Sequence, residues 1–350
     1  MNRRKTAIFK AGLDALHFCR AHLALAPFTA GSGVIFTLHH VLPGSPADFA
    51  PNRILAITPE FLEATVLAIR AAGLDIVSLD EARRRLLQGD DRRFACLTFD
   101  DGYRDNLVYA WPVLRRLEAP FCIYVTTCLP DHTAEPWWLI LERVIAGTDR
   151  LSEPMGRGSA PLDCGNLDQK YAVYEIVYWW LRRRSEPERR AVARGLAARH
   201  GLDVRAMVAE LALSWQELAE LAADPLVTIG AHTVDHPMLG ALPEAEAEYQ
   251  MAESRRRIAE RIGIRPQHFA YPYGDPASAG PREFALAARL GFATAVTTRP
   301  GVVFPDHRAH LSALPRVSLN GDYQSRKYLD LYLTGAPFAL WRGFRRVDAA

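Results

Sequence analysis

Residues 94–103 read Phe94-Ala95-Cys96-Leu97-Thr98-Phe99-Asp100-Asp101-Gly102-Tyr103, an apolar run that ends in two adjacent carboxylates and a turn. Such a run before Asp-Gly predicts a buried strand that stops near Gly102. Side chains alternate across a strand, so Asp100 and Asp101 point in different directions unless the backbone breaks there. Two such acids can have different roles: one can bind a metal while the other takes a proton from the water bound to that metal. A plain strand end with an Asp-Gly turn is the alternative.

Similar apolar runs recur along the chain and alternate with helical patterns. The strand candidates are 34–39, 75–78, 94–100, 121–126, 226–232, 268–271, 292–297 and 314–319. Helical patterns lie near 59–72, 80–88, 105–117, 243–262 and 281–290. This alternation predicts an α/β protein with a parallel sheet, either open or closed into a barrel. In both cases the active site lies at the carboxyl ends of the strands.

Two segments depart from this alternation. Residues 131–222 are dominated by helical patterns, so we expect a helical insertion whose aromatic residues fit hydrophobic packing better than a sugar platform. Residues 1–30 predict an N-terminal amphipathic helix, over about 7–26, before a main domain at 31–350. Packing on the domain suits this helix better than anchoring at a membrane surface, and peripheral membrane contact is the alternative. No run approaches the ~20 apolar residues of a transmembrane helix.

The composition narrows the class of protein. The 350 residues include 42 basic and 40 acidic side chains, for a formal charge of +2, which argues against nucleic acid as a partner. The cysteines are odd in number and form no C-x-x-C pattern, so we expect buried thiols of a reducing compartment. Charged residues interrupt the N-terminal apolar stretch, which argues against a secretory signal. The expected location is therefore cytoplasmic.

A second strand end carries two histidines in Ile229-Gly230-Ala231-His232-Thr233-Val234-Asp235-His236-Pro237. On a helical turn, residues four positions apart share a face, so both imidazoles can reach one ion. A catalytic zinc site needs three nitrogen or oxygen ligands and a position left for water, a count that Asp101, His232 and His236 satisfy. Thr233 excludes the H-E-x-x-H metalloprotease pattern. A polar loop in which the histidines only cap the backbone is the alternative.

A third segment, Phe269-Ala270-Tyr271-Pro272-Tyr273-Gly274, follows another strand candidate and ends in a turn. Its proline and glycine restrict the backbone, so that an exposed N–H could face a developing oxyanion. Taken alone, it is an ordinary aromatic turn.

Together the three segments resemble the polysaccharide deacetylase family of carbohydrate esterases, whose shared unit is called the NodB homology domain. The resemblance covers about residues 30 to 320, apart from the insertion. It implies a distorted (β/α) barrel of about seven strands. It also implies metal-dependent removal of acetyl groups from an N-acetylated glycan, usually with Zn²⁺, although Co²⁺ or another divalent ion is an alternative.

The resemblance also implies roles for individual residues. Asp100 would be the general base, and Tyr273 would contribute its backbone N–H to an oxyanion hole. The metal ligands would be Asp101, His232 and His236.

Two departures from the family pattern concern the catalytic groups. The family commonly has an arginine that orients the base where this chain has Ala270, and our hypothesis is that Arg316 supplies the cation instead. The late Leu-x-x-His motif that usually carries the general acid is also missing. The segment Thr37-Leu38-His39-His40-Val41 resembles the early histidine segment of the poly-N-acetylglucosamine deacetylase branch, so His39 is assigned as the acid. His40 and His310 are the alternates.

Other functions remain open at this stage. A glycosidase needs two carboxylates that flank a bond at roughly 5 to 9.5 Å, which adjacent aspartates are poorly placed to do. A non-catalytic carbohydrate-binding descendant would fit the two departures. Hydrolysis of another non-peptide amide would fit the same machinery.

Overall fold

The computed structural model describes residues 3–347, with side chains from residue 9 onward. The ends of the two predicted segments, at residues 1–2 and 348–350, lie outside the described residues. Seven parallel strands close into a barrel, because the first strand pairs with both the last strand and β5. Around the barrel the order is β1 (Gly33–Leu38), β12 (Leu314–Ser318), β11 (Thr294–Pro300), β10 (His268–Ala270), β9 (Val227–Ala231), β6 (Phe121–Val125) and β5 (Phe94–Phe99). The predicted (β/α) barrel of about seven strands is confirmed.

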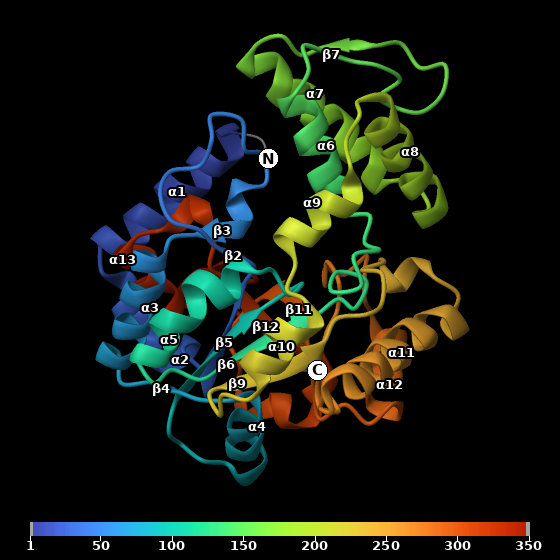
Figure 1. Cartoon of the computed structure of the whole chain (residues 1–350). Helices are drawn as coiled ribbons and strands as arrows, with labels where there is room; N and C mark the ends of the chain where they lie inside the picture. Colours follow the sequence, from blue (N-terminus) through green and yellow to red (C-terminus); the bar gives the residue numbers. More distant parts are fainter. Residues whose placement is uncertain (1–2, 348–350) are drawn as a thin grey trace.

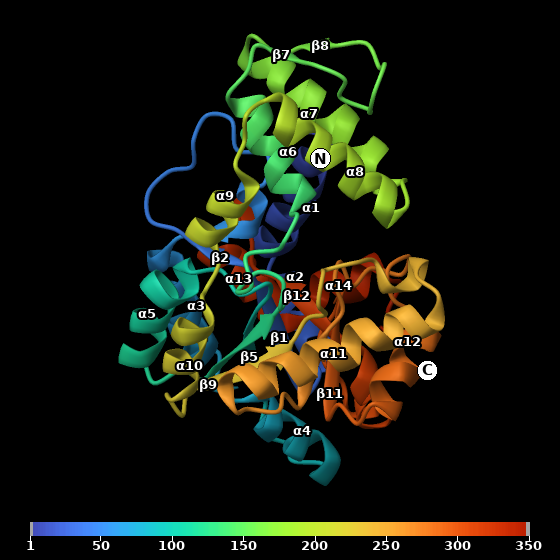
Figure 2. The same ribbon diagram turned by 45° about the vertical axis from the view of Figure 1, so that its right-hand side comes forward.

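Helices cover the outside of the barrel (Figures 1 and 2). They are α3 (Pro59–Ala71), α4 (Leu79–Gln88), α5 (Trp111–Arg116), α10 (Trp215–Ala222), α11 (Glu244–Ile262), α12 (Pro281–Arg289), α13 (Arg326–Thr334) and α14 (Ala336–Trp341). The start of α3 illustrates how the sequence sets these boundaries. The Thr58 side chain accepts a hydrogen bond from the Phe61 N–H, and Pro59 occupies the first turn, where its missing N–H leaves no donor unsatisfied.

Shorter elements complete the barrel domain. β4 (Asp75–Ile76) extends the sheet beside β5, and β2 (His40–Val41) pairs with β3 (Ala56–Ile57). The 3₁₀ turns are η1 (Arg53–Leu55), η3 (Leu239–Ala241), η4 (Pro305–Ala309), η5 (Leu311–Ala313) and η6 (Gly321–Tyr323). The helix predicted over 105–117 differs from the expectation, because it opens with a π-helical turn, η2 (Asn106–Ala110). Such turns are rare and are frequently found at functional sites.

The N-terminal segment forms two helices, α1 (Arg3–Phe18) and α2 (Ala21–Thr29), where the sequence predicted one. The break lies at Arg20, whose φ of 55° is left-handed and cannot continue a helix. The Thr29 hydroxyl donates to the Thr334 carbonyl at 2.7 Å, which ties the end of α2 to α13. Among the described residues, no helix is long and apolar enough to cross a membrane.

The helical insertion lies between β6 and β9 and forms a separate lobe, drawn in green at the top of Figure 1. It contains α6 (Trp137–Ala146), β7 (Arg150–Leu151), β8 (Leu162–Asp163), α7 (Leu167–Arg182), α8 (Glu186–Arg199) and α9 (Val204–Leu211). The lobe has its own hydrophobic core, which reaches Ala212. Leu218 and Leu221 of α10 instead pack in the barrel core. The core of the lobe therefore ends near residue 212, whereas the sequence predicted an insertion that continues to about residue 222.

Candidate active site

Strand register brings the sequence motifs together at the carboxyl end of the barrel. Leu38 of β1 lies opposite Phe99 of β5, so the next residues, His39 and Asp100, are neighbours. The Asp100 N–H donates to the Leu38 carbonyl at 2.9 Å and continues the ladder by one bond. Val125, the last residue of β6, lies opposite Ala231, the last residue of β9. His232 follows Ala231 and therefore lies at the same end of the barrel.

Several site residues have a left-handed backbone, which side chains other than glycine rarely adopt. The φ angles are 76° at Asp101, 68° at Thr233, 57° at His236 and 59° at Tyr273. Such conformations are strained and gather at functional sites. At Asp101 the left-handed turn ends the strand. Asp100 contacts Arg316, whereas Asp101 lies near His232 and His236.

Asp101, His232 and His236 converge on one point. Their ligand atoms all lie within 4.8 Å of one another. The Nε2 atoms of His232 and His236 are 3.6 and 3.4 Å from Asp101 Oδ1. The Nδ1 atom of His232 is 2.7 Å from the Ala270 carbonyl and donates to it, which orients Nε2 toward Asp101.

This cluster fits a divalent cation. Asp101 Oδ1 and His236 Nδ1 are buried without a hydrogen-bond partner among the described residues, and a buried unpaired carboxylate oxygen is unfavourable without a cation. Two imidazoles and one carboxylate are a donor set that zinc accepts. Burial, opposed by the charge of Asp101, lowers the pKa of His236 to about 4, so its ring is neutral and can bind metal.

Asp100 is held by Arg316, as the sequence hypothesis proposed. The two guanidinium nitrogens donate to Asp100 Oδ1 at 2.7 Å and Oδ2 at 2.6 Å. Arg316 also donates to the Thr297 carbonyl at 2.8 Å and to the Thr98 hydroxyl at 3.1 Å. Both members of the ion pair are buried. Burial alone would raise the pKa of Asp100, but the charges of Arg316 and then His232 outweigh it and lower the pKa, so the carboxylate is ionised.

The three candidate histidines differ in their surroundings. His39 is partly exposed and lies near both aspartates; burial lowers its pKa, against the opposing charges of Asp100 and Asp101. His40 Nδ1 lies 2.6 Å from Asp105, and its ring stacks on Tyr103 at 3.7 Å. None of the described contacts of His310 reaches either aspartate.

Tyr273 follows β10 and lies beside the ligand cluster. Its ring centroid is 4.9 Å from that of His236, and its hydroxyl accepts a hydrogen bond of 3.1 Å from Trp137. The carbonyl of Tyr273 accepts from the Thr298 hydroxyl. Its backbone N–H has no acceptor among the described residues. The N–H is therefore free to receive a negatively charged oxygen.

The sequence interpretation missed two groups of residues. The insertion lobe supplies one wall of a pocket that Asp101 and His236 also line, and this wall includes Glu135, Trp137 and Trp138. The Trp138 ring lies 5.2 Å from that of His236, although the sequence favoured hydrophobic packing over a sugar platform for the aromatic residues of the lobe. The second group is Asp105 with Asn106, which fix the segment around His40. The one sequence feature that pointed to this pair was Asp105 itself, an acidic residue just beyond the Asp-Asp-Gly turn.

Comparisons with known proteins agree with this geometry. Residues 170–295 match the family model described as Polysaccharide deacetylase, a range that includes the second and third motifs. No curated protein sequence matches the chain. One similar solved structure is the Streptococcus pyogenes deacetylase PplD in complex with acetate, at 18% identity and a TM-score of 0.56, over 85% of this chain and 95% of that one.

Two further solved structures share the fold. IcaB from Ammonifex degensii is 21% identical with a TM-score of 0.53, over 87% of this chain and 98% of that one. A de-N-acetylase from Aggregatibacter actinomycetemcomitans is 13% identical with a TM-score of 0.53, over 85% and 99%. The family match over residues 170–295, the closed barrel and the three motifs at its strand ends agree with the resemblance drawn from the sequence.

Proposed function

We propose that the protein is a metal-dependent deacetylase that hydrolyses the N-acetyl amide of a sugar in an oligosaccharide, a polysaccharide or a glycan precursor. One observation carries this proposal: the ion-paired carboxylate of Asp100 lies next to a buried cluster of Asp101, His232 and His236 that lacks internal hydrogen bonds. The relatives named above as deacetylases support it.

Each of these residues would have a defined part in amide hydrolysis. Asp101, His232 and His236 would hold the cation, which supplies a Lewis acid and lowers the pKa of water, and Zn²⁺ suits the donor set best. Asp100, kept ionised and oriented by Arg316, would take a proton from the attacking water. The Tyr273 N–H would stabilise the oxyanion of the tetrahedral intermediate. His39 would protonate the departing sugar amine, and acetate would be released.

The geometry disfavours a glycosidase. A glycosidase needs one carboxyl group that is free to protonate the leaving oxygen. Asp100 instead binds Arg316 through both oxygens, and Asp101 faces two imidazoles. Neither carboxyl group is free for that role.

The test starts from protein stripped of metal by a chelator. Zn²⁺ or Co²⁺ is added back, and acetate release is measured on a panel of N-acetylated oligosaccharides in parallel with the formation of new reducing ends. We expect metal-dependent acetate release and no new reducing ends. New reducing ends would point to a glycosidase. Sugar binding without either product would point to a non-catalytic descendant.

A further inference from the structure

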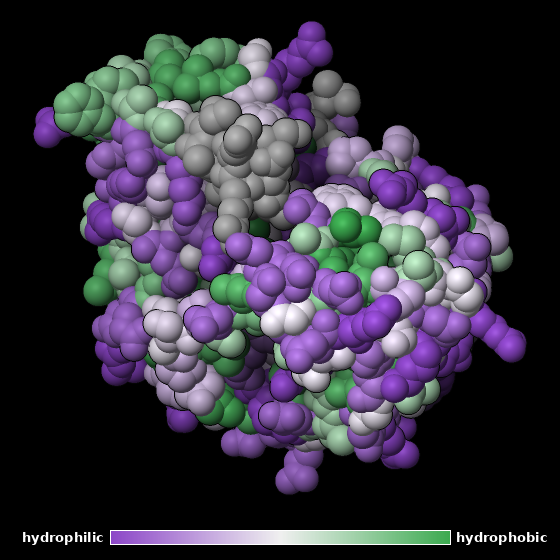
Figure 3. Space-filling model, turned by 90° about the horizontal axis from the view of Figure 1, so that it is seen from above, coloured by the Kyte–Doolittle hydropathy of each residue, from purple (hydrophilic) through white to green (hydrophobic). Residues whose placement is uncertain are grey.

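The described helices near the two ends of the chain present an unusual number of exposed large apolar side chains. Phe18 is 90% exposed, Phe28 78% and Trp341 72%, and Leu23 and Phe344 are more than half exposed. Figure 3 shows hydrophobic surface along its upper left edge, where these helices lie. We call these five residues the apolar ridge. Single exposed apolar residues are common, but several large ones on adjacent helices indicate an interaction surface.

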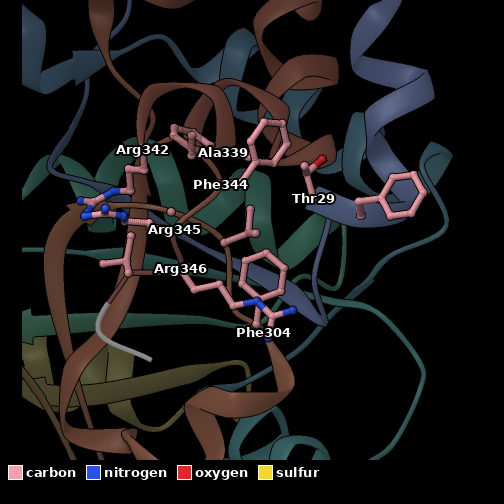
Figure 4. Close-up of a pocket in the computed structure, with 13 residues that line it drawn as sticks. Thr29, Phe304, Ala339, Arg342, Phe344, Arg345 and Arg346 are labelled. Carbon is pink, nitrogen blue, oxygen red and sulfur yellow. The ribbon is translucent and has the colours of Figure 1, made fainter. Parts of the chain in front are cut away.

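The helices that carry the ridge pack against one another, because α2 contacts both α1 and α14. The ring of Phe9, on α1, meets that of Trp341, on α14, at a centroid distance of 5.4 Å. Phe28, on α2, lines a pocket together with Phe344, just beyond α14 (Figure 4). Leu23 and Phe28 lie on the same helix. The ridge therefore runs across α1, α2 and α14.

Two basic pockets flank the ridge. The first contains Phe28 and Phe344 with three arginines, Arg342, Arg345 and Arg346 (Figure 4). The second contains Leu23 with His17, His22 and three more arginines, Arg20, Arg93 and Arg326. Only one carboxylate, Asp330, lines either pocket. The chain as a whole carries only +2, so these six arginines are a local concentration of positive charge.

Several of these cations lack a full set of acceptors. Arg20 and Arg345 are exposed, and their side chains make no hydrogen bond or ion pair within the described part of the chain. Arg93 donates to the Leu333 carbonyl at 2.8 Å, but its Nε is buried with no acceptor among the described residues. By contrast, Arg326 pairs with Asp330, and Arg346 pairs with Asp306. The free cations lie on both sides of the ridge.

We infer that this face binds the surface of a membrane that contains anionic lipids. An apolar ridge that includes a tryptophan and is bordered by arginines suits the boundary between headgroups and acyl chains. Anionic headgroups complement the exposed, unpaired Arg20 and Arg345, whereas a second copy of the chain would place arginines against arginines. Binding would bring the deacetylase to a lipid-bound or membrane-proximal substrate. The inference about the surface is independent of the proposed activity.

Vesicle flotation tests the inference with the full-length protein. The vesicles are phosphatidylcholine, with or without added phosphatidylglycerol. We expect the protein to float with the anionic vesicles and not with the neutral ones, and high salt to reduce binding. The double variants Phe18→Ser/Phe28→Ser and Arg20→Glu/Arg345→Glu should each lower the partition coefficient about tenfold or more.

Matched variants elsewhere on the surface serve as controls. Leu67 and Ile176 are each 50% exposed, and Leu67→Ser/Ile176→Ser should bind like the wild type. Arg157→Glu/Arg183→Glu makes the same charge change on the insertion lobe and should have little effect. Thermal melts show whether each variant is folded, and acetate release from soluble substrate should be unchanged in the ridge variants.

Three outcomes would overturn the inference. The first is that the folded wild type fails to float with anionic vesicles. The second is that the ridge variants float as well as the wild type, or that the control variants lose binding equally. The third is that light scattering detects a dimer that becomes a monomer in Phe18→Ser/Phe28→Ser, which would mean that a second copy covers the ridge.

Discussion

Replacing Arg316 with lysine tests how the general base is supported. Lysine keeps the positive charge but has a single nitrogen, so it cannot reproduce the forked contact to both oxygens of Asp100. It also cannot keep every bond that Arg316 makes to Thr98 and Thr297. The variant therefore perturbs the orientation of Asp100 and leaves the metal ligands in place.

The size of the effect follows from these contacts. A hydrogen bond to a charged group contributes about 1.5–3 kcal/mol. If Asp100 loses one such bond in the transition state, kcat falls about 10- to 150-fold, because about 1.4 kcal/mol corresponds to a factor of ten. Arg316 is buried and contacts Asp100, so KM should change less than about threefold.

The assay is steady-state acetate release, with metal content measured by elemental analysis. Arg255→Lys is the matched control. Arg255 is also a buried arginine, 6% exposed, but it donates to the backbone carbonyls of Pro266, Leu290 and Gly291. Arg255→Lys should lose stability and keep its kcat. A folded Arg316→Lys enzyme with wild-type kcat, or an equal loss of kcat in Arg255→Lys, would refute the role assigned to Arg316.

Three further predictions concern other parts of the molecule. His39→Gln should lower kcat about 100-fold or more without loss of metal. His40→Gln breaks the hydrogen bond to Asp105 and should mainly lower the melting temperature. The reverse pattern would make His40 the acid. Trp138→Ala should raise KM for oligosaccharides about three- to tenfold with a smaller change in kcat, and an unchanged KM would remove the insertion lobe from substrate binding. Of the five cysteines only Cys19 is exposed, so a thiol reagent should titrate one thiol in the native protein and five in denaturant. Reaction of a second thiol in the native protein would contradict the burial of the other four.

The sequence predicted the elements whose signals are local. Apolar runs bounded by turns marked all seven barrel strands, and Asp-Asp-Gly and the paired histidines marked two strand ends. Because the carboxyl ends of parallel strands meet on one face, these local signals were enough to predict the ligand cluster. Arg316 was only a hypothesis, since 216 residues separate it from Asp100 and no local pattern links them.

Features set by tertiary contacts were harder to predict. The break at Arg20 has no glycine or proline to announce it, and the one predicted helix became two. The helical pattern of residues 215–222 looked like part of the insertion, although its leucines pack in the barrel core. Trp138 has the helical spacing of a packing residue, and only the position of the lobe above the barrel brings it to the pocket. These outcomes depend on how separate elements pack together.

The most direct test of the proposed division of labour compares Asp100→Asn and Asp101→Asn in one experiment. Acetate release and metal content are measured on the same purified, folded proteins. We expect Asp100→Asn to retain metal and lose turnover, because it keeps the ligand cluster and removes the base. Asp101→Asn should lose both metal and turnover. Wild-type acetate release by Asp100→Asn, or full metal retention by Asp101→Asn, would contradict the account.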